Sequence, residues 1–158
     1  MIIRPAEMGD VPVLEDIVER AYRVYIERIG RRPGPMDDDY AALVHSAATE
    51  IFVAVQDASG ERVVGLIVLE PGPDHVVIAN VAVDPERQHA GIGRALLAYA
   101  EEFAAAHGLD EVRLYTNVTM TENQRLYRGL GYRETGREII LGRYQRIHFS
   151  KALSSRRA

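Results

Sequence analysis

The sequence predicts a mixed α/β fold, an open sheet of about seven strands covered by about four helices. Two observations carry this prediction. Apolar residues recur at helical spacing in two long segments, and short runs rich in valine and isoleucine lie between and after them. A strand, a long helix and another strand follow one another over residues 75–116, which predicts a central right-handed β-α-β crossover joining parallel strands.

The composition is that of a single globular domain. The 158 residues are 47% hydrophobic and 27% charged, with a formal net charge of -4. We assign the domain to residues 1–153 and expect a frayed tail at 154–158. The net negative charge argues against general nucleic-acid binding. Since no apolar run reaches the length of a membrane span and no signal-peptide pattern is present, we expect no membrane association and a cytoplasmic location.

Residue counts exclude several reaction classes. The chain has no cysteine, so a thiol nucleophile, a disulfide and a zinc–thiolate site are excluded. Its one lysine, Lys151, falls in an expected final strand, which argues against a phosphate-loop ATPase and a Schiff-base enzyme. We predict no metal site, because the histidines show no ligand spacing; they stand at positions 45, 75, 89, 107 and 148.

The N-terminal part reads as a strand, two helices and a loop. A short strand is expected at Ile2–Pro5, and Asp10 is expected to cap a helix that Gly30 ends. Prolines and a glycine make 30–39 a loop. A short second helix follows and runs to about Ala48.

The middle of the chain reads as sheet. Ile51–Gln56 and Arg62–Glu70, with a turn at Gly60, predict a hairpin whose continuous apolar runs imply burial on both faces. The run His75–Asp84 extends that sheet.

The remaining elements complete the crossover. A helix is expected from about Arg87 to just before Gly108, followed by a strand at Val112–Thr116. Thr121 is expected to cap a short helix that ends at Gly131. Two late strands are expected at Tyr132–Arg137 and Tyr144–Leu153.

The most informative stretch is Asn80–Leu97, NVAVDPERQHAGIGRALL, where a strand ends and a helix begins in a turn with Gly91 and Gly93. Main-chain N–H groups at the start of a helix have no helical acceptor and carry partial positive charge. The glycines let an anion approach them closely. This stretch therefore predicts a diphosphate-binding turn.

The same stretch resembles a signature of the GNAT superfamily of N-acetyltransferases: Gln or Arg, two residues, Gly, one residue, Gly or Ala. Here it reads Gln88-His89-Ala90-Gly91-Ile92-Gly93. The segment Leu114–Tyr132, LYTNVTMTENQRLYRGLGY, resembles the next motif of that superfamily, in the same order and at a similar separation. The resemblance covers nearly the whole chain, and the region 21–48 is only loosely similar.

The resemblance implies a GNAT-like fold and an acyltransferase that moves an acetyl group from acetyl-CoA to a primary amine. It implies that Tyr127 donates a proton to the departing thiolate and that the Val81 N–H binds the thioester carbonyl. Placement of the ligand beyond the carboxyl ends of parallel strands agrees with general rules for such sheets. The implied coenzyme A contacts are Val81, Ala82, Val83, Gln88, His89, Ala90, Gly91, Ile92, Gly93, Arg94, Asn123 and Tyr127.

One motif position departs from the common family pattern. The pattern places an asparagine where this chain has Met120. Asn123 lies one helical turn before Tyr127 and is the expected pantetheine contact. Asn117 is an alternative contact, and a turn-forming role for it is equally expected.

The acceptor is expected to bind between the first two helices and the sheet. Asp37, Asp38 and Asp39 either attract a cationic amine or simply cap the second helix. The expected acceptor-side residues are Tyr22, Tyr25, Arg31, Met36, Asp37, Asp39, Tyr40, Asn80 and Tyr115.

The group that deprotonates the amine stays open. Related acetyltransferases carry a glutamate at the position of Tyr115 or near Asn80, and this chain has no carboxylate at either place. We prefer a water chain held by Asn80 and Tyr115. The alternatives are His75, Glu70, Asp37 and Asp39.

Direct transfer in a ternary complex is expected, because no cysteine is present to form an acyl-enzyme. A small-molecule amine is the preferred acceptor, a protein or peptide N-terminus is the second candidate, and a non-catalytic acyl-CoA binding module is the third. The resemblance implies that a homodimer is common, although no sequence feature defines the oligomeric state or the acyl-chain preference.

Overall fold

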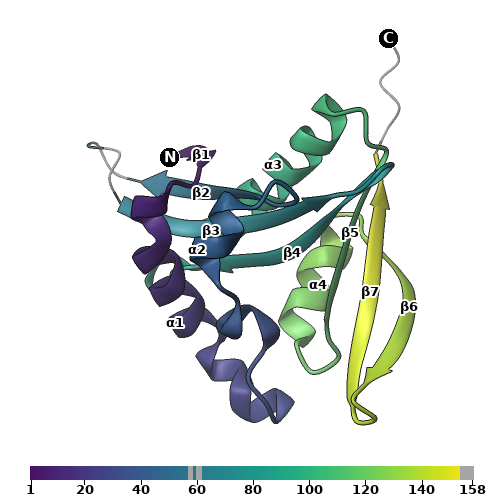
Figure 1. Cartoon of the computed structure of the whole chain (residues 1–158). Coiled ribbons are helices and arrows are strands. Elements are labelled where there is room, and N and C mark those ends of the chain that lie inside the picture. The colour runs from purple at the N-terminus through teal and green to yellow at the C-terminus, as the bar shows by residue number, and fades with distance from the viewer. Residues whose placement is uncertain (57–58, 60–61, 154–158) are drawn as a thin grey trace.

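The computed structural model describes residues 1–56, 59 and 62–153 (Figure 1). The expected turn at Gly60 and the expected frayed tail at 154–158 lie outside these residues. The strands form one sheet in the order β1-β2-β3-β4-β5-β7-β6, in which only the β4–β5 pair is parallel. The mixed α/β prediction with its central crossover is confirmed.

The elements have the following bounds. The strands are β1 (Ile2–Pro5), β2 (Glu50–Gln56), β3 (Arg62–Pro71), β4 (His75–Val83), β5 (Glu111–Asn117), β6 (Arg133–Ile140) and β7 (Tyr144–Ala152). The helices are α1 (Val11–Ile29), α2 (Tyr40–His45), α3 (Ile92–Ala106) and α4 (Thr121–Gly129). Short 3-10 turns are η1 (Met8–Asp10), η2 (Gly34–Asp37) and η3 (Pro85–Arg87).

Three helix boundaries differ from the sequence prediction. Helix α2 ends before Ala48, because Ser46 is extended and its hydroxyl accepts the Ala48 N–H at 3.1 Å. Helix α3 begins at Ile92 rather than near Arg87, since a 3-10 turn and two left-handed residues precede it. Thr121 is the first residue of α4 and not its cap, and no side chain caps that helix.

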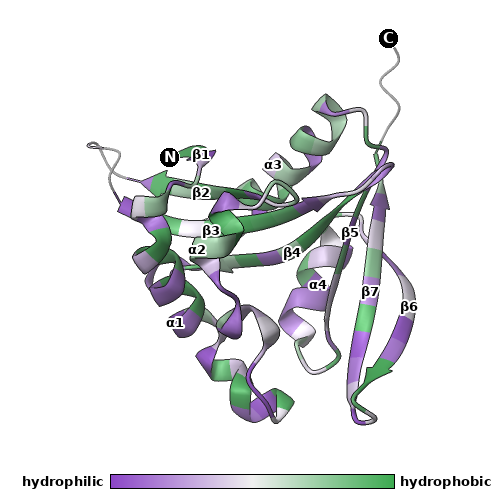
Figure 2. Ribbon diagram, viewed as in Figure 1, coloured by the Kyte–Doolittle hydropathy of each residue, from purple (hydrophilic) through white to green (hydrophobic). Residues whose placement is uncertain are grey.

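Two apolar clusters cover opposite faces of the sheet. Helices α1 and α2 pack on one face around Leu14 and Leu66, and α3 and α4 pack on the other around Leu96 and Ile67. The adjacent residues Leu66 and Ile67 therefore face opposite clusters, which confirms that β3 is buried on both sides. Figure 2 shows mostly hydrophobic residues along β3 and many hydrophilic residues along the edge strand β6.

Strands β4 and β5 separate part-way along their length. Their parallel pairing runs only from His75–Glu111 to Ile78–Leu114, although both strands continue. Immediately after Ile78 the register of β4 against β3 shifts by one residue, which makes Ala79 the extra residue of a bulge. Because a bulge bends its strand and increases local twist, β4 turns away from β5 and opens the centre of the sheet (Figure 1).

The helices of the described residues include none with the length and apolar character needed to cross a membrane.

Close packing of α3 on β3 depends on Gly65. A Cβ at this position would lie 3.1 Å from Ile92 Cγ2, from Leu96 Cδ1 and from the Ala82 carbonyl oxygen. We predict that Gly65→Ala lowers the free energy of unfolding by about 1–3 kcal/mol through overpacking. Denaturant unfolding measures this loss, with Gly136→Ala as control because a Cβ there meets nothing within 4 Å. Equal stability of the two variants would contradict the prediction.

Candidate active site

Two cavities meet where the sheet opens. The first, here called the turn groove, runs along the residues before and at the start of α3, including Gln88, Gly91 and Arg94. The second, here called the sheet pocket, lies between α1, β5 and β7 and has a volume of about 170 Å³. Both cavities share the same junction, which is lined by Tyr22, Val81, Met120, Asn123 and Tyr127.

The Asp84 carboxylate holds the start of the turn in place. It accepts the Glu86 N–H at 3.0 Å and binds the Arg20 guanidinium of α1 at 2.9 and 3.2 Å. The hydrogen bonds from Arg20 keep the pKa of Asp84 below its usual value, although burial opposes that shift. The turn is therefore tied to α1 by a largely buried ion pair.

The turn itself presents main-chain N–H groups. His89 has φ of 68° and Gly91 has φ of 84°, both left-handed, so the chain turns sharply at these two residues before α3 begins. The Ala95 N–H donates to the Gly91 carbonyl at 3.0 Å as the first turn of α3. The preceding N–H groups of α3, including that of Gly93, have no helical acceptor. Of the predicted turn residues, Ala90 does not line the groove.

The main chain of Val81 points into the opening. The Asp84 N–H donates to the Val64 carbonyl at 2.8 Å, so this facing pair is hydrogen-bonded. Hydrogen-bonded and non-hydrogen-bonded pairs alternate along an antiparallel pair of strands. Counting back from Asp84, the pair of Val81 with Ile67 is therefore a non-hydrogen-bonded pair. The N–H and carbonyl of Val81 therefore point away from β3, and the carbonyl accepts the Tyr22 hydroxyl at 3.3 Å.

A chain of side-chain hydrogen bonds supports the floor of the sheet pocket. The Tyr22 hydroxyl donates to Asn80 Oδ1 at 2.6 Å, and Asn80 Nδ2 donates to the Tyr40 hydroxyl at 3.0 Å. Tyr40 in turn donates to the Pro35 carbonyl at 2.6 Å. Burial raises the pKa of both tyrosines, so both hydroxyls remain neutral. The chain fixes the orientation of the buried Asn80 amide.

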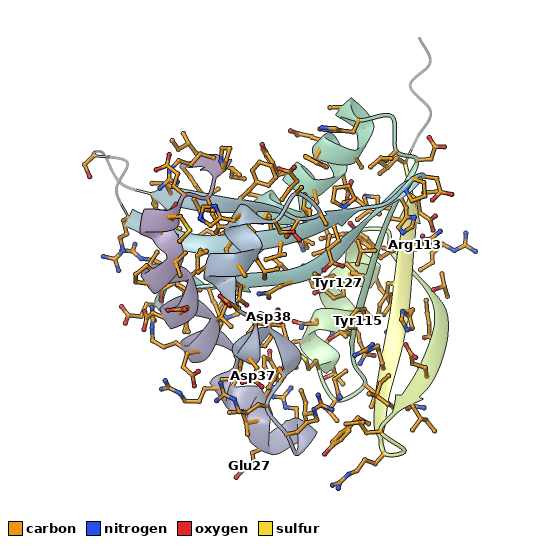
Figure 3. The ribbon with its side chains drawn as sticks, viewed as in Figure 1. Glu27, Asp37, Asp38, Arg113, Tyr115 and Tyr127 are labelled. Carbon is orange, nitrogen blue, oxygen red and sulfur yellow. The ribbon has the colours of Figure 1, made fainter. Side chains whose placement is uncertain are left out.

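Tyr127 lies on α4 at the junction of the two cavities (Figure 3). Its ring packs against Tyr132 and Phe149. Burial raises the pKa of its hydroxyl well above the ordinary value, which keeps the group protonated across neutral and alkaline pH. Within the described part of the chain no residue hydrogen-bonds this hydroxyl, and Asn123, one turn earlier, lines both cavities.

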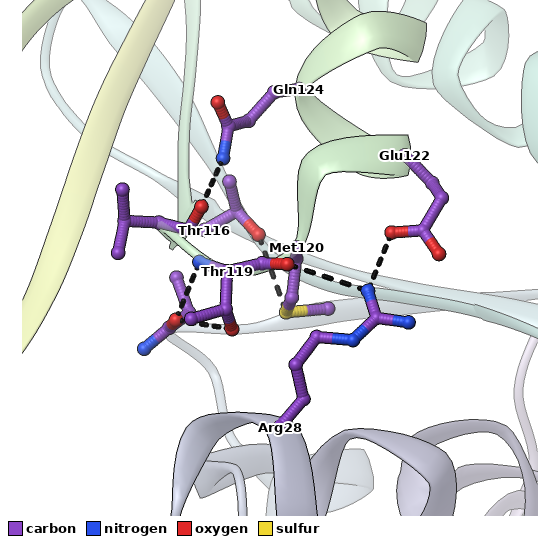
Figure 4. Close-up of polar contacts among 8 residues, drawn as sticks. Arg28, Thr116, Thr119, Met120, Glu122 and Gln124 are labelled. Carbon is purple, nitrogen blue, oxygen red and sulfur yellow. Dashed lines mark hydrogen bonds and ion pairs between the residues drawn. The ribbon is translucent and has the colours of Figure 1, made fainter.

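The segment before α4 is held by local hydrogen bonds and one ion pair to α1 (Figure 4). Asn117 Oδ1 accepts the Thr119 N–H at 2.9 Å and its hydroxyl at 2.7 Å, which is the turn-forming arrangement. Arg28 of α1 donates to Glu122 at 2.6 Å and to the Thr119 carbonyl at 3.3 Å. These contacts join α1 to α4 beside the junction.

Met120, where the family pattern has an asparagine, is buried at the same place. Its sulfur accepts the Thr116 hydroxyl at 3.5 Å, and Gln124 Nε2 donates to the Val118 carbonyl at 2.7 Å (Figure 4). The junction wall is therefore apolar at Met120, while Asn123 supplies the nearest amide.

The structure separates the expected acceptor-side residues into two sets. Tyr22, Arg31, Asn80 and Tyr115 line the sheet pocket. The others have different surroundings: Tyr25 lines the turn groove, Met36 and Tyr40 pack in the apolar cluster of α1, Asp37 binds Arg32 at 3.0 Å, and Asp39 caps α2.

Part of the sheet pocket was not predicted. One wall is formed by the last residue of β6, Ile140, and by the first three residues of β7, which are Tyr144, Gln145 and Arg146. Sequence spacing carries no signal for this wall, because it reaches the pocket only through the pairing of β7 with β5.

The alternative bases His75 and Glu70 lie away from both cavities. His75 binds Asp74 at 2.7 Å at the far end of β4, and neither His75 nor Glu70 lines a cavity described above. The described residues contain no group of three or more His, Cys, Asp or Glu side chains arranged to hold a metal.

The model of the acetyltransferase (GNAT) family matches residues 13–132. This span includes the glycine turn before α3, the opening between β4 and β5, and Tyr127. The chain belongs to the GNAT family.

Relatives with assigned names agree with this membership. Mycothiol acetyltransferase from Clavibacter michiganensis is 31% identical over 120 residues, which is 76% of this chain and 38% of that protein. Human N-acetyltransferase 8 is 30% identical over 88 residues, 52% of this chain and 39% of that protein. The chain thus spans about two fifths of the length of these GNAT relatives.

Solved GNAT structures share the fold. The ribosomal-protein-S18-alanine N-acetyltransferase from Escherichia coli has a TM-score of 0.78 at 21% identity, covering 98% of this chain and 94% of that one. PaiA N-acetyltransferase from Thermoplasma acidophilum, solved in complex with coenzyme A, has a TM-score of 0.78 at 18% identity, covering 96% and 98%. At such identities the likeness establishes the fold.

The Arg20–Asp84 ion pair generates a stability prediction. Because the pKa of Asp84 is lowered by folding, its stabilisation is present above the unfolded pKa of about 3.9 and is lost as pH falls through the folded pKa. Asp84→Asn is expected to lower the free energy of unfolding by about 1–3 kcal/mol at pH 7, and by progressively less below about pH 4.

The matched control is Asp16→Asn. Asp16 also binds Arg20, at 2.9 Å, but its side chain is 57% exposed, so the expected loss is below about 1 kcal/mol. Urea unfolding at pH 7 and pH 3.5 measures both variants. A loss for Asp84→Asn that is equal at the two pH values would contradict the assignment of the stabilisation to this ion pair.

Proposed function

We propose that this GNAT domain transfers an acetyl group from acetyl-CoA to a primary amine within a ternary complex. The observation that carries the proposal is the junction of two cavities in the opened sheet. One cavity is suited to a diphosphate and the other to a small acceptor, and Val81 and Tyr127 lie between them. In the reaction the amine nitrogen bonds to the thioester carbon and the carbon–sulfur bond breaks.

The turn groove suits coenzyme A. The N–H groups of 91–94 point where a diphosphate would bind, and Arg94 and Arg87 also line the groove and add positive charge. The remaining proposed contacts follow the groove from Gln88 and His89 to the edge of β4 at Val81–Val83. There the outward main-chain groups of the strand are available to the amides of the pantetheine arm.

The Val81 N–H is proposed to stabilise the developing oxyanion. This N–H points away from β3 into the opening, where the carbonyl oxygen of a thioester would accept its hydrogen bond. As the amine attacks, negative charge builds on that oxygen, and a fixed N–H in a site with little water stabilises it more than water does. Such a donor contributes about 3 kcal/mol in other acyl transfers.

Tyr127 is proposed to donate a hydrogen bond to the leaving thiolate and then to protonate it. Its hydroxyl is neutral, unpaired within the described residues and placed at the junction. A buried phenol with a raised pKa acts first as a hydrogen-bond donor to the sulfur. Proton transfer follows because the thiolate in the same dry site is a stronger base than in water.

The amine proton is proposed to leave through water. Asn80 and Tyr115 both line the sheet pocket, and the Asn80 amide is held by two tyrosines, so it can orient a water without moving. Tyr22 is not suited to act as a base, because burial keeps its hydroxyl protonated.

A small acceptor is favoured by the size of the pocket. Its volume of about 170 Å³ is below the roughly 300 Å³ at which pockets for drug-sized molecules begin. The solved fold relatives include an enzyme named for a ribosomal protein and another named for streptothricin, and neither shows which acceptor this chain takes. The decisive experiment is a screen of amines with acetyl-CoA in which thiol release is followed. Release no faster than buffer hydrolysis for every amine, together with heat on acetyl-CoA binding, would favour an acyl-CoA binding module.

Tyr127→Phe tests the acid. We expect kcat to fall about 100-fold while acetyl-CoA affinity, measured by calorimetry, changes little. Because the pKa of Tyr127 is raised, the protonated form persists as pH rises, so the wild type should lose no activity through this group below about pH 10. Tyr99→Phe, on α3 away from both cavities, is the control. An unchanged kcat for Tyr127→Phe across pH would refute the assignment.

Gly93→Asp, with Gly93→Ala as its control, tests the diphosphate site separately from folding. A Cβ at Gly93 would meet only Val83 Cγ2 at 3.8 Å, so there is room for it. Removing a glycine from the first turn of a helix should leave stability unchanged or raise it by up to about 1 kcal/mol. The family signature admits alanine at this position, so Gly93→Ala should leave the affinity for coenzyme A nearly unchanged. The carboxylate of Gly93→Asp would repel a diphosphate bound at the turn, and we expect at least a tenfold loss of coenzyme A affinity by calorimetry. Unchanged affinity for Gly93→Asp would place the diphosphate elsewhere.

A further inference from the structure

The charge of the sheet pocket is opposite to the net charge of the chain. Two arginines, Arg31 and Arg146, belong to the lining, and no aspartate or glutamate does. We infer that the acceptor amine carries an oxyanion, a carboxylate or a phosphate, which these two arginines bind. The inference rests on the proposed acetyl transfer and names the class of its acceptor.

Arg31 is left without a carboxylate partner. It follows Gly30, whose left-handed φ of 91° ends α1 and turns the chain toward the pocket. The next residue, Arg32, takes both nearby carboxylates, Asp37 at 3.0 Å and Glu19 at 3.3 Å. Across the described ranges no carboxylate pairs with Arg31, and its guanidinium instead lies 5.0 Å from the centre of the Tyr144 ring.

Arg146 is stacked and only weakly paired. Its guanidinium lies 3.9 Å from the centre of the Tyr115 ring, and its nearest carboxylate, Glu138, is 3.8 Å away. The same Glu138 oxygen is held by His148 Nε2 at 2.5 Å. A guanidinium stacked by its face keeps its edge N–H groups in a planar fork, which matches the two oxygens of a carboxylate or phosphate.

The two arginines line the part of the sheet pocket that is not shared with the turn groove. The junction with the turn groove includes Val81 and Tyr127, whereas Arg31, Tyr144 and Arg146 line the sheet pocket alone. An acceptor that fills the pocket therefore reaches the thioester with its amine while its oxyanion meets the arginines.

This arrangement disfavours cationic acceptors. The expected attraction of a cationic amine by the aspartates at 37–39 has no support in the pocket, because none of the three lines it. Asp37 is paired with Arg32, and Asp39 caps α2. A polyamine would bring a second positive charge toward two arginines, and like charges without screening partners raise the free energy of binding.

The test compares acceptors that differ only in the oxyanion. One arm compares glycylglycine with glycylglycinamide, a second compares O-phosphoethanolamine with ethanolamine, and a third uses spermidine. We expect kcat/KM at least tenfold higher for the anionic member of one pair, since hydrogen bonds between a guanidinium and an oxyanion are stronger than those between neutral groups. The pair that shows the preference distinguishes a carboxylate from a phosphate. Equal values within both pairs, or a preference for spermidine, would overturn the inference.

Three matched variants assign the effect to the pocket. Arg31→Gln and Arg146→Gln should lower the anionic-to-neutral ratio of kcat/KM by tenfold or more. Arg143→Gln should change the ratio less than twofold, because Arg143 also lies 5.0 Å from the Tyr144 ring but does not line the pocket. Thermal unfolding verifies that all three variants fold. An equal change of the ratio in all three variants would show a general charge effect and contradict the inference.

A binding measurement separates the inference from the proposed function. Calorimetric titrations of the same pairs are carried out with and without coenzyme A. Tighter binding of an anionic member that Arg31→Gln abolishes supports the oxyanion site even when no acetyl transfer occurs, and in that case only the proposed function fails. Acetyl transfer without discrimination between the pair members overturns only the inference.

Discussion

The separation of β4 from β5 is the constraint on which the rest of this molecule depends. Pairing stops after Ile78 and Leu114, and the bulge at Ala79 directs the remaining residues of β4 away from its neighbour. A strand edge inside a domain leaves N–H and carbonyl groups that require a partner, because an unpaired buried polar group costs about 1–3 kcal/mol. Both cavities meet at the Val81 edge, and in the proposed function a ligand along this edge would supply that partner.

The surrounding side chains keep the opening from closing. The Arg20–Asp84 pair ties α1 to the end of β4, and the Arg28–Glu122 pair ties α1 to α4. Helix α1 thus contacts both sides of the opening. The hydroxyl of Tyr22, on the same helix, donates to Asn80 and to the Val81 carbonyl. Contacts of this kind fix the walls of a cavity, and fixed walls reduce the free energy needed to order a site on binding.

The two cavities are made from different parts of the chain. The turn groove is formed by α1, the end of β4, the turn before α3 and α4, all within the residues matched by the GNAT family. The sheet pocket takes one wall from residues 140–146, which lie beyond that match. In the proposed function, the thioester chemistry would fall within the matched residues, and part of the choice of acceptor would fall on residues beyond them. Of the two arginines in the sheet pocket, Arg31 lies within the match and Arg146, on β7, lies beyond it.

The sequence by itself determined the fold class, the crossover, the glycine turn before α3 and the position of Tyr127 in its motif, because each depends on spacing within one or two elements. Helix boundaries such as that of α3 depended on left-handed residues at His89 and Gly91, which spacing alone does not reveal. Only the tertiary structure decided the bulge at Ala79, since the apolar pattern of β4 is the same with or without it. It also decided which residues surround the acceptor pocket: strand pairing brings Arg146 against Tyr115, and local ion pairs withdraw Asp37. Such contacts join residues far apart in the chain, and their register follows from the packing of the whole sheet.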